Sequence, residues 1–244
     1  MSSDLATGIG PAGARVLIFR KEALWVHPSN AVAAPVLEHE CEALGMHVEI
    51  SDDASLFTRT NLERFDVVVF SLTSGETLNA AERQAFHAWF INHGSFVGIH
   101  SASYTDITDP FMVEMIGATF KTHPPVASAT VNVVDTKHPI TQGLGTKFRR
   151  EDEWYTFERR PEDNPQVHVL LTLDEQSAHP NYFGADASPG LSVGYHPHTW
   201  TIERTSSRMF YTAMGHTPES WSEPPFVSMV VRAIIWAAEE RARR

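Results

Sequence analysis

Short runs of hydrophobic residues alternate with helical patterns along the first half of the chain. Four runs have the length and side-chain types of strands buried in a sheet: Val16–Phe19, His47–Ile50, Asp66–Ser71 and Ser95–Ile99. Helices are predicted between them, one after Ser29 that ends at Gly45 and one that begins with a capping box formed by Asn79 and Glu82. Strand–helix–strand units of this length predict an α/β protein with three layers, α/β/α, and a mostly parallel central sheet.

The second half is richer in predicted strands and closes with a helix. The strands are expected at Ala129–Val134, Val167–Thr172, Leu191–Tyr195 and Arg208–Thr212. A short helix is expected around Phe111–Ile116, and hydrophobic residues three and four apart from Phe226 to Ile234 predict a final helix that docks on the sheet. Because no linker, repeat or charge block interrupts these elements, we expect one domain over residues 15–244 after a flexible tail over residues 1–14.

Charge and cysteine content narrow the classes of function. The 244 residues include 30 Asp and Glu against 19 Lys and Arg, which gives a formal net charge of −11 with the histidines neutral. An acidic chain without a basic run does not favour binding to nucleic acid or to a membrane surface. The single cysteine, Cys41, excludes an internal disulfide framework and a cysteine-clustered metal site. Because residues 1–14 lack the basic start and the apolar stretch of a signal peptide, we expect a cytoplasmic protein.

Candidate chemistry follows the ends of the predicted strands. Open parallel sheets bind ligands outside the carboxyl ends of their strands. His27, His100 and His216 each follow a different predicted strand, so we expect their side chains to meet at one edge of the sheet. Loops that carry Thr73–Glu76 and Glu219 reach the same edge. Imidazole nitrogens with a carboxylate suit Zn²⁺ or another first-row divalent metal, and they equally suit acid–base catalysis near neutral pH.

Three other segments leave alternatives open. The pair His196 and His198 would lie on one side of a strand, where a solvent-facing or structural role is favoured over a metal site. The elbow Gly98–Ser103 lacks the G-x-S-x-G pattern of serine hydrolases and carries a histidine where a cysteine would indicate a glutaminase. Glu151–Tyr155 is either a solvated charge run, which the segment alone favours, or a loop that offers Glu153 as base or ligand beside an aromatic platform for a sugar.

Eight stretches, in order from Val16 to Trp221, resemble motifs of the trehalose-utilisation (ThuA-like) family: VLIFRKEALWVHPSN, DVVVFSLTSGETL, FVGIHSAS, IGATFKTHP, KHPITQGL, EDEWYTF, VHVLLTLDE and MFYTAMGHTPESW. The resemblance implies a flavodoxin-like fold of the class I glutamine amidotransferase type without the catalytic cysteine. It also implies a pocket with these residues in its lining: His27, Thr73, Gly75, His100, His123, Glu153, Trp154, Tyr155, His216 and Glu219. Glu76 is expected to bind substrate where the family often has an aspartate, and Ser188–Leu191 stands where a His-Pro is common.

The resemblance further implies a protein of carbohydrate metabolism that acts on a disaccharide or an oxidised (keto) sugar. In this interpretation His27, His100 and His216 hold a divalent metal such as Zn²⁺ or a polarised water. His100 and His216 are catalytic with Glu153 as general base, the two aromatic residues after Glu153 orient the sugar, and no nucleotide cofactor is expected. The expected partners are a small carbohydrate, a sugar dehydrogenase of the same pathway and a second copy of the chain. The alternative is a non-catalytic carbohydrate-binding or regulatory module, which the missing His-Pro favours.

Overall fold

The structure is a computed structural model that describes residues 12–183 and 191–242. Most of the predicted tail, and the segment Ser188–Gly190 where the His-Pro is missing, lie outside the described residues. The strands are β1 (Arg15–Phe19), β2 (His47–Ser51), β3 (Val67–Ser71), β4 (Ser95–Ile99), β5 (Phe120–Thr122), β6 (Ala127–Val133), β7 (Lys147–Asp152), β8 (Thr156–Phe157), β9 (Val167–Asp174), β10 (Pro197–Glu203) and β11 (Arg208–Thr212). The helices are α1 (Asn30–Ala43), α2 (Arg59–Leu62), α3 (Ala80–Asn92), α4 (Pro110–Ile116), α5 (Pro180–Phe183) and α6 (Pro224–Ala242).

A nine-stranded sheet in the order β2-β1-β3-β4-β11-β10-β9-β6-β7 runs through the described part of the molecule. The first five strands in this order are mutually parallel. Strands β10 and β6 are antiparallel to the neighbours on both of their sides. Because each reversal is followed by a second one, β9 and β7 again run in the direction of β11. Most strands therefore share one direction, as the sequence predicts, although the second half pairs antiparallel.

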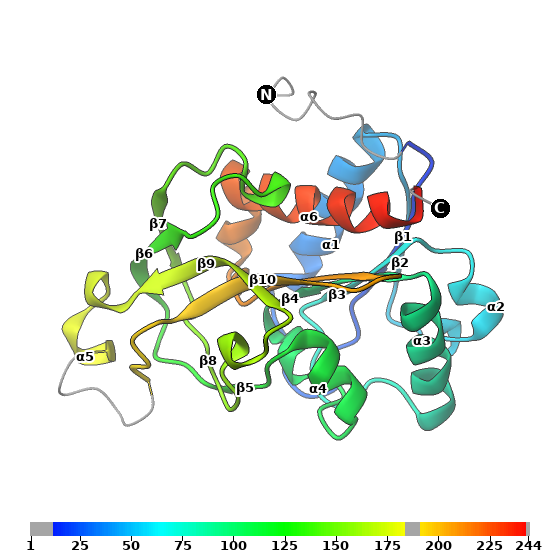
Figure 1. The fold of residues 1–244 in the computed structure, drawn as a ribbon, viewed down its shortest axis with the longest axis horizontal. Helices are drawn as coiled ribbons and strands as arrows, with labels where there is room; N and C mark the ends of the chain where they lie inside the picture. Colours follow the sequence, from blue (N-terminus) through cyan, green and yellow to red (C-terminus); the bar gives the residue numbers. More distant parts are fainter. Residues whose placement is uncertain (1–11, 184–190, 243–244) are drawn as a thin grey trace.

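Helices cover both faces of this sheet, which confirms the predicted three-layer fold (Figure 1). Helices α1 and α6 lie on one face, and α2, α3 and α4 lie on the other. The alternation of side chains along β1 explains why both faces need a cover: Val16 and Ile18 pack with the α1–α6 side, while Leu17 and Phe19 pack with the α3–α4 side. All four of these side chains are fully buried, so water reaches neither face of the strand.

The helix predicted from Asn79 and Glu82 begins as expected. The Asn79 side chain accepts hydrogen bonds from the backbone N–H groups of Ala81 and Glu82 at 2.9 and 3.1 Å, and the Glu82 carboxylate accepts the Asn79 N–H at 2.7 Å. These bonds satisfy backbone donors that the first turn of a helix otherwise leaves unpaired. The capping box is therefore formed, and α3 ends at Asn92, just before the predicted stop at Gly94.

The strand predicted at Leu191–Tyr195 is wrong, and the neighbouring segment forms β10 instead. The backbone N–H groups of Val193 and Gly194 donate to a side chain, the Glu175 carboxylate, at 2.7 and 3.2 Å, so neither joins a strand ladder. Strand β10 has the sequence PHTWTIE, which contains no continuous hydrophobic run and therefore does not indicate a buried strand. Its first six residues are nevertheless buried. The charged strand β7, with the sequence KFRRED, was also not predicted, for the same reason.

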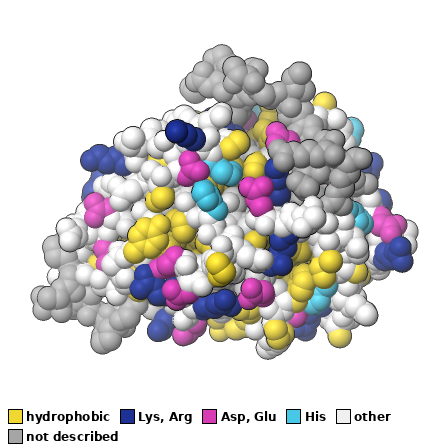
Figure 2. All heavy atoms as spheres, in the orientation of Figure 1, with side chains coloured by type: hydrophobic (Ala, Val, Ile, Leu, Met, Phe, Trp, Pro, Cys, Tyr) yellow, Lys and Arg dark blue, Asp and Glu magenta, His cyan; other side chains and the backbone are white. Residues whose placement is uncertain are grey.

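The surface of the described residues carries charges of both signs. Figure 2 shows Lys and Arg side chains interspersed with Asp and Glu on the face in view, together with histidine side chains between acidic ones. Among the helices described, none combines the length and the apolar character needed to cross a membrane.

Candidate functional site

Three loops at the carboxyl ends of the parallel strands bring together His27, His100 and His216. Their strands β1, β4 and β11 lie in the same half of the sheet, with β3 between β1 and β4. Each histidine offers one ring nitrogen, and the three nitrogens all lie within 4.8 Å of one another. The structure therefore brings the three predicted imidazoles into one cluster, at the edge where the strand order places it.

His100 lies at the centre of this cluster and has no exposed surface. Its backbone has a φ of +53°, a left-handed conformation that is uncommon outside glycine and that turns the chain sharply after β4. The Nδ1 atom of its ring is 2.7 Å from the carbonyl oxygen of Ala213, which can only accept, so Nδ1 carries the proton. In the neutral ring, Nε2 then presents its lone pair to the cluster.

His27 is oriented in the same manner by a carboxylate. Its Nδ1 atom is 3.0 Å from Oε1 of Glu22, and the same oxygen accepts the His27 backbone N–H at 2.6 Å. Both residues are largely shielded from solvent, with 8% and 13% of their side-chain surfaces exposed. A carboxylate or carbonyl partner on the far nitrogen is the usual arrangement of metal-binding histidines, because it selects the tautomer and aims the other nitrogen.

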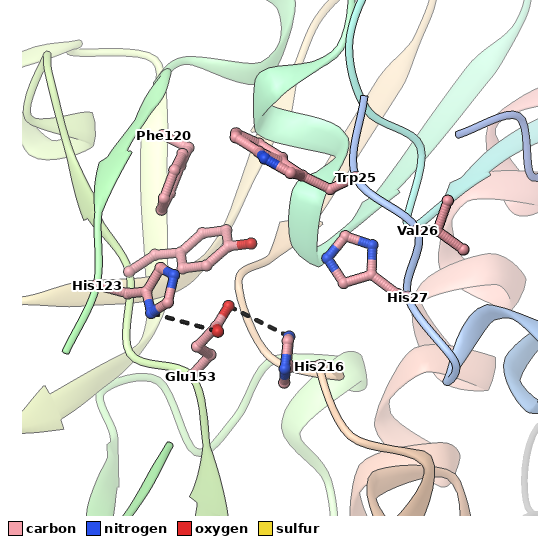
Figure 3. A pocket seen from close by; sticks show the side chains of 8 residues that line it. Trp25, Val26, His27, Phe120, His123, Glu153 and His216 are labelled. Carbon is pink, nitrogen blue, oxygen red and sulfur yellow. Dashed lines mark ion pairs between the residues drawn. The ribbon is translucent and has the colours of Figure 1, made fainter. Parts of the chain in front are cut away.

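Glu153 brings a carboxylate into contact with His100, His123 and His216, the last two of which are drawn in Figure 3. Its Oε2 atom is 3.4 Å from Nε2 of His100 and 3.2 Å from Nδ1 of His216, while its Oε1 atom is 3.3 Å from Nδ1 of His123. Burial raises the pKa of Glu153, but its contacts with His100, His216 and His123 favour the ionised carboxylate more strongly and leave the pKa below its usual value. Glu153 is therefore ionised at neutral pH.

Burial disfavours the charged form of His216, which lowers the pKa of the imidazole. The proximity of His100 lowers this pKa further, although the Glu153 carboxylate raises it. His216 is therefore neutral at neutral pH and offers a lone pair.

The donor atoms of His100, His216 and Glu153 have spacings that fit a divalent cation. The two imidazole nitrogens, Nε2 of His100 and Nδ1 of His216, are 3.2 Å apart, and the carboxylate oxygen completes a triangle with sides of 3.2 and 3.4 Å. Two nitrogens bound to tetrahedral Zn²⁺ at about 2.0–2.1 Å would be about 3.3–3.4 Å apart. Nitrogen and carboxylate donors in this combination are also the ones that first-row metals prefer.

Tyr155 would compete with a metal ion for one of these donor atoms, Nε2 of His100. Its hydroxyl oxygen is 2.8 Å from Nε2 of His100, and burial raises the pKa of the phenol well above its usual value, so the hydroxyl keeps its proton. The phenol then donates to the same lone pair that a cation would use. Its ring also packs against the His100 ring at a tilt of 34°, with the ring centres 4.4 Å apart.

A cavity of about 300 Å³ opens beside these groups. Its polar side is formed by histidines and Glu153, and its apolar side by aromatic and aliphatic side chains (Figure 3). The complete lining is Trp25, Val26, His27, Phe120, His123, Glu153, Tyr155 and His216. The volume lies at the lower end of the range for small-molecule sites, about 300–1,000 Å³.

Several residues expected in the pocket lie elsewhere. The position expected for Trp154 in the pocket is wrong. Its side chain is fully buried in the core, and its indole N–H donates to the carbonyl oxygen of Ala127 at 2.8 Å. Successive side chains of extended backbone point to opposite sides, so Glu153 and Tyr155 reach the pocket while Trp154 points away from it.

Four further residues also lie outside the cavity lining. The hydroxyl of Thr73 is buried against that of Thr105 at 2.7 Å, and Glu76 pairs with Arg83 at 3.1 Å. Glu219 is exposed to solvent. Gly75 has a φ of +75°, and a Cβ atom there would lie 2.9 Å from Cβ of Leu24, so this glycine lets two loops approach each other.

His196 and His198 are both buried, so a solvent-facing position is wrong for them. His196 has a structural role, because Nδ1 is 2.8 Å from Glu175 and Nε2 is 2.8 Å from the carbonyl oxygen of Tyr155. Both neighbours are acceptors, so each ring nitrogen of His196 faces an oxygen atom that can accept a hydrogen bond from it. Although burial opposes it, hydrogen bonds from His196, Ser192 and the backbone lower the pKa of Glu175 to about 2.

Sequence reasoning missed Asp152, which joins the two loops that carry Glu153 and His216. Its Oδ1 atom accepts the backbone N–H groups of Glu153 and His216 at 2.9 and 3.1 Å. Its Oδ2 atom accepts the N–H of Gly215 at 2.8 Å and is 3.0 Å from the guanidinium of Arg150. Asp152 is fully buried. The sequence shows only that Asp152 lies in an acidic segment, and an acidic residue in such a segment is usually exposed to solvent.

Trp25 and Phe120 were also missed as lining residues. Trp25 lies in the loop that carries His27, and Phe120 belongs to β5, which pairs with β8 directly after Tyr155. No motif distinguishes these aromatic side chains from ordinary core residues, so only their place in the fold shows that they line the cavity.

Solved structures with the same fold come from several organisms. A protein described as ThuA-like from Bacteroides uniformis ATCC 8492 is 26% identical with a TM-score of 0.78, covering 93% of this chain and 92% of that chain. Another described as ThuA-like, from Parabacteroides merdae ATCC 43184, is 19% identical with a TM-score of 0.71, covering 93% and 90%. The glutaminase domain of Trypanosoma brucei CTPS is 9% identical with a TM-score of 0.52 and 95% of both chains covered, a likeness of fold alone.

At the level of sequence, no curated protein matches the chain significantly. A family model does match it, the one named ThuA and described as trehalose utilisation, over residues 15–237. With nearly the whole domain matched and the fold shared with ThuA-like proteins, the chain belongs to the ThuA family of trehalose-utilisation proteins.

Proposed function

We propose that the chain is a carbohydrate-processing enzyme that acts on a disaccharide or an oxidised sugar with the help of a divalent metal. The observation that carries this proposal is the convergence of His27, His100 and His216 from three separate loops, with the carboxylate of Glu153 in contact with His100 and His216. Membership of the ThuA family supports a sugar-related role, and the cavity beside the cluster provides room for a small ligand. A bound divalent cation would polarise a carbonyl oxygen or lower the pKa of a bound water.

In this proposal, the side chains of the site have separate roles in ligand binding and proton transfer. The carbonyl oxygen of Ala213 holds a proton on Nδ1 of His100, so Nε2 is the atom that faces the site, and burial favours the neutral form of His216. Glu153 is ionised at neutral pH and accepts a proton from a sugar hydroxyl or a water, as a general base does. Tyr155 keeps its phenolic proton and donates it in a hydrogen bond to His100 or, when His100 is engaged, to the ligand.

Metal analysis of the purified protein tests the metal part of the proposal. We expect about one equivalent of a divalent first-row metal in the wild type, or after incubation with Zn²⁺ or Mn²⁺, and a loss of at least tenfold in affinity for His100→Ala. His47→Ala is the matched control, because His47 is exposed on β2, away from the cluster. Failure of the wild type to bind any of these metals would overturn the metal part.

Ligand binding tests the carbohydrate part. Sugars or keto sugars that bind the folded protein should raise its melting temperature by mass action. A panel of disaccharides and their oxidised forms that gives no shift would contradict the substrate assignment.

A non-catalytic carbohydrate-binding module is the second candidate, favoured by Ser188–Leu191, where the family commonly has a His-Pro. The two candidate functions predict different results for the Glu153→Gln variant. An enzyme loses turnover while it retains ligand binding, whereas a binding module shows no turnover in the wild type either.

A further inference from the structure

The loop between β1 and α1 exposes three consecutive hydrophobic residues. Leu24, Trp25 and Val26 have 54%, 37% and 79% of their surfaces exposed. Single exposed hydrophobic residues are common on protein surfaces and need no explanation. Three in succession, of which Trp25 and Val26 line a cavity, are different, because polar residues in their place would expose no apolar surface to water. We call this group, Leu24–Val26, the apolar lip.

The lip is held in place by backbone hydrogen bonds, so its exposure follows from an ordered loop. The backbone N–H of Ala23 donates to the carbonyl oxygen of Ser74 at 2.8 Å. The hydroxyl of Ser74 accepts the N–H of Trp25 at 2.9 Å and donates to the Trp25 carbonyl oxygen at 3.0 Å. Glu22 closes the loop by accepting the N–H of His27. These hydrogen bonds hold the backbone of the loop in a conformation that leaves Leu24 and Val26 more than half exposed.

The lip continues the apolar wall of the cavity. The Trp25 ring packs against Tyr104 and Phe120, with ring centres 4.7 and 5.6 Å apart, and Trp25 and Val26 both line the cavity. Figure 3 shows Trp25 and Phe120 across from His123 and Glu153, with Val26 beyond His27. A ligand that enters the cavity therefore meets polar groups at the histidine cluster and hydrophobic surface at the mouth.

We propose that the ligand is a glycoside that carries an apolar aglycone, with the sugar at the histidine cluster and the aglycone on the apolar lip. This inference rests on the proposed function, in which the cavity binds a sugar. A free sugar presents hydroxyl groups around its ring and would leave Leu24 and Val26 in water. An aryl or alkyl group joined to that sugar buries these side chains, and the removal of their apolar surface from water stabilises the complex.

Binding of matched glycosides to the full-length protein tests the inference. Calorimetry with methyl and 4-nitrophenyl glucosides, each in both anomeric forms, compares ligands with the same sugar and different aglycones. We expect the wild type to bind the 4-nitrophenyl glucoside at least about tenfold more tightly than the methyl glucoside. The Leu24→Ser/Val26→Ser variant should lose most of this difference, because its affinity for the 4-nitrophenyl glucoside falls much more than its affinity for the methyl glucoside. Val134→Ser is the control, because Val134 is similarly exposed, at 51%, and does not line the cavity.

Four outcomes would overturn the inference, and they separate it from the proposed function. Equal affinity of the wild type for both glucosides overturns the aglycone assignment and leaves the sugar site standing. Equal weakening of both glucosides in the lip variant has the same meaning. Binding of neither glucoside overturns the inference together with its sugar site. A wild-type dimer that dissociates in the lip variant assigns the apolar lip to a second copy of the chain, which overturns the inference; thermal melting shows that the variant is folded.

Discussion

The substitution Asp152→Asn tests a residue that holds the site together without lining the cavity. Asp152 is fully buried, and each of its two oxygen atoms accepts two donors. In the asparagine variant one of these oxygens becomes an NH₂ group. If the amide oxygen keeps the N–H groups of Glu153 and His216, the NH₂ group faces the N–H of Gly215 and the guanidinium of Arg150, which are both donors.

The size of the expected loss in stability follows from the two hydrogen-bond donors that the variant leaves unpaired. Hydrogen bonds to a charged group are worth about 1.5–3 kcal/mol each, and the variant loses two of them. The Arg150 side chain is only 1% exposed, so its charge has no access to water, although Glu223 and Ser220 lie 3.6 and 2.8 Å away and compensate in part. Removing one partner of a buried pair costs about 3–5 kcal/mol, and we expect a loss near the lower end, about 3 kcal/mol, in the free energy of unfolding.

Urea unfolding followed by far-ultraviolet circular dichroism measures this loss. The same variant should bind Zn²⁺ about 10–100-fold more weakly, because Glu153 and His216 are no longer held against each other. Asp52→Asn is the control, since Asp52 is exposed in a loop after β2. A loss of less than about 1 kcal/mol would refute the assigned role of Asp152 in joining the two loops.

Three further perturbations test separate parts of the structure. Because the folded-state pKa of Glu175, about 2, lies below its usual value of 4.5, its stabilising contribution is complete above about pH 4.5 and disappears as the pH falls toward 2. Urea unfolding of Glu175→Gln across this interval should show a flatter pH dependence than the wild type, and an identical slope would contradict the assignment. Tyr155→Phe frees the lone pair of His100, so calorimetry should show Zn²⁺ binding about threefold to tenfold more tightly, whereas weaker binding would mean that the hydroxyl helps to hold the metal. Gly75→Ala should destabilise the fold by about 1–3 kcal/mol more than Gly145→Ala, since both positions have positive φ but only Gly75 is crowded; equal losses in urea unfolding would exclude the crowding.

Local sequence patterns determined the parallel half of the fold. The hydrophobic runs of β1, β3 and β4 are buried on both faces, and such runs have few alternatives to a covered sheet. Asn79 and Glu82 specify the start of α3 through contacts within one turn. The convergence of His27, His100 and His216 was also predictable, because residues after parallel strands share one edge whatever their separation in sequence.

The remaining features depended on contacts between distant segments. Strand β10, with its buried His198, is polar in sequence and becomes core only because β9 and β11 flank it. Glu153 and Trp154 are adjacent in an acidic segment, and no local signal tells which one faces the cavity. That choice is made where Asp152 accepts hydrogen bonds from Gly215 and His216, which lie more than sixty residues away. Local spacing encodes which backbone a segment adopts, whereas the partner of each buried polar group is decided only when the whole chain has folded.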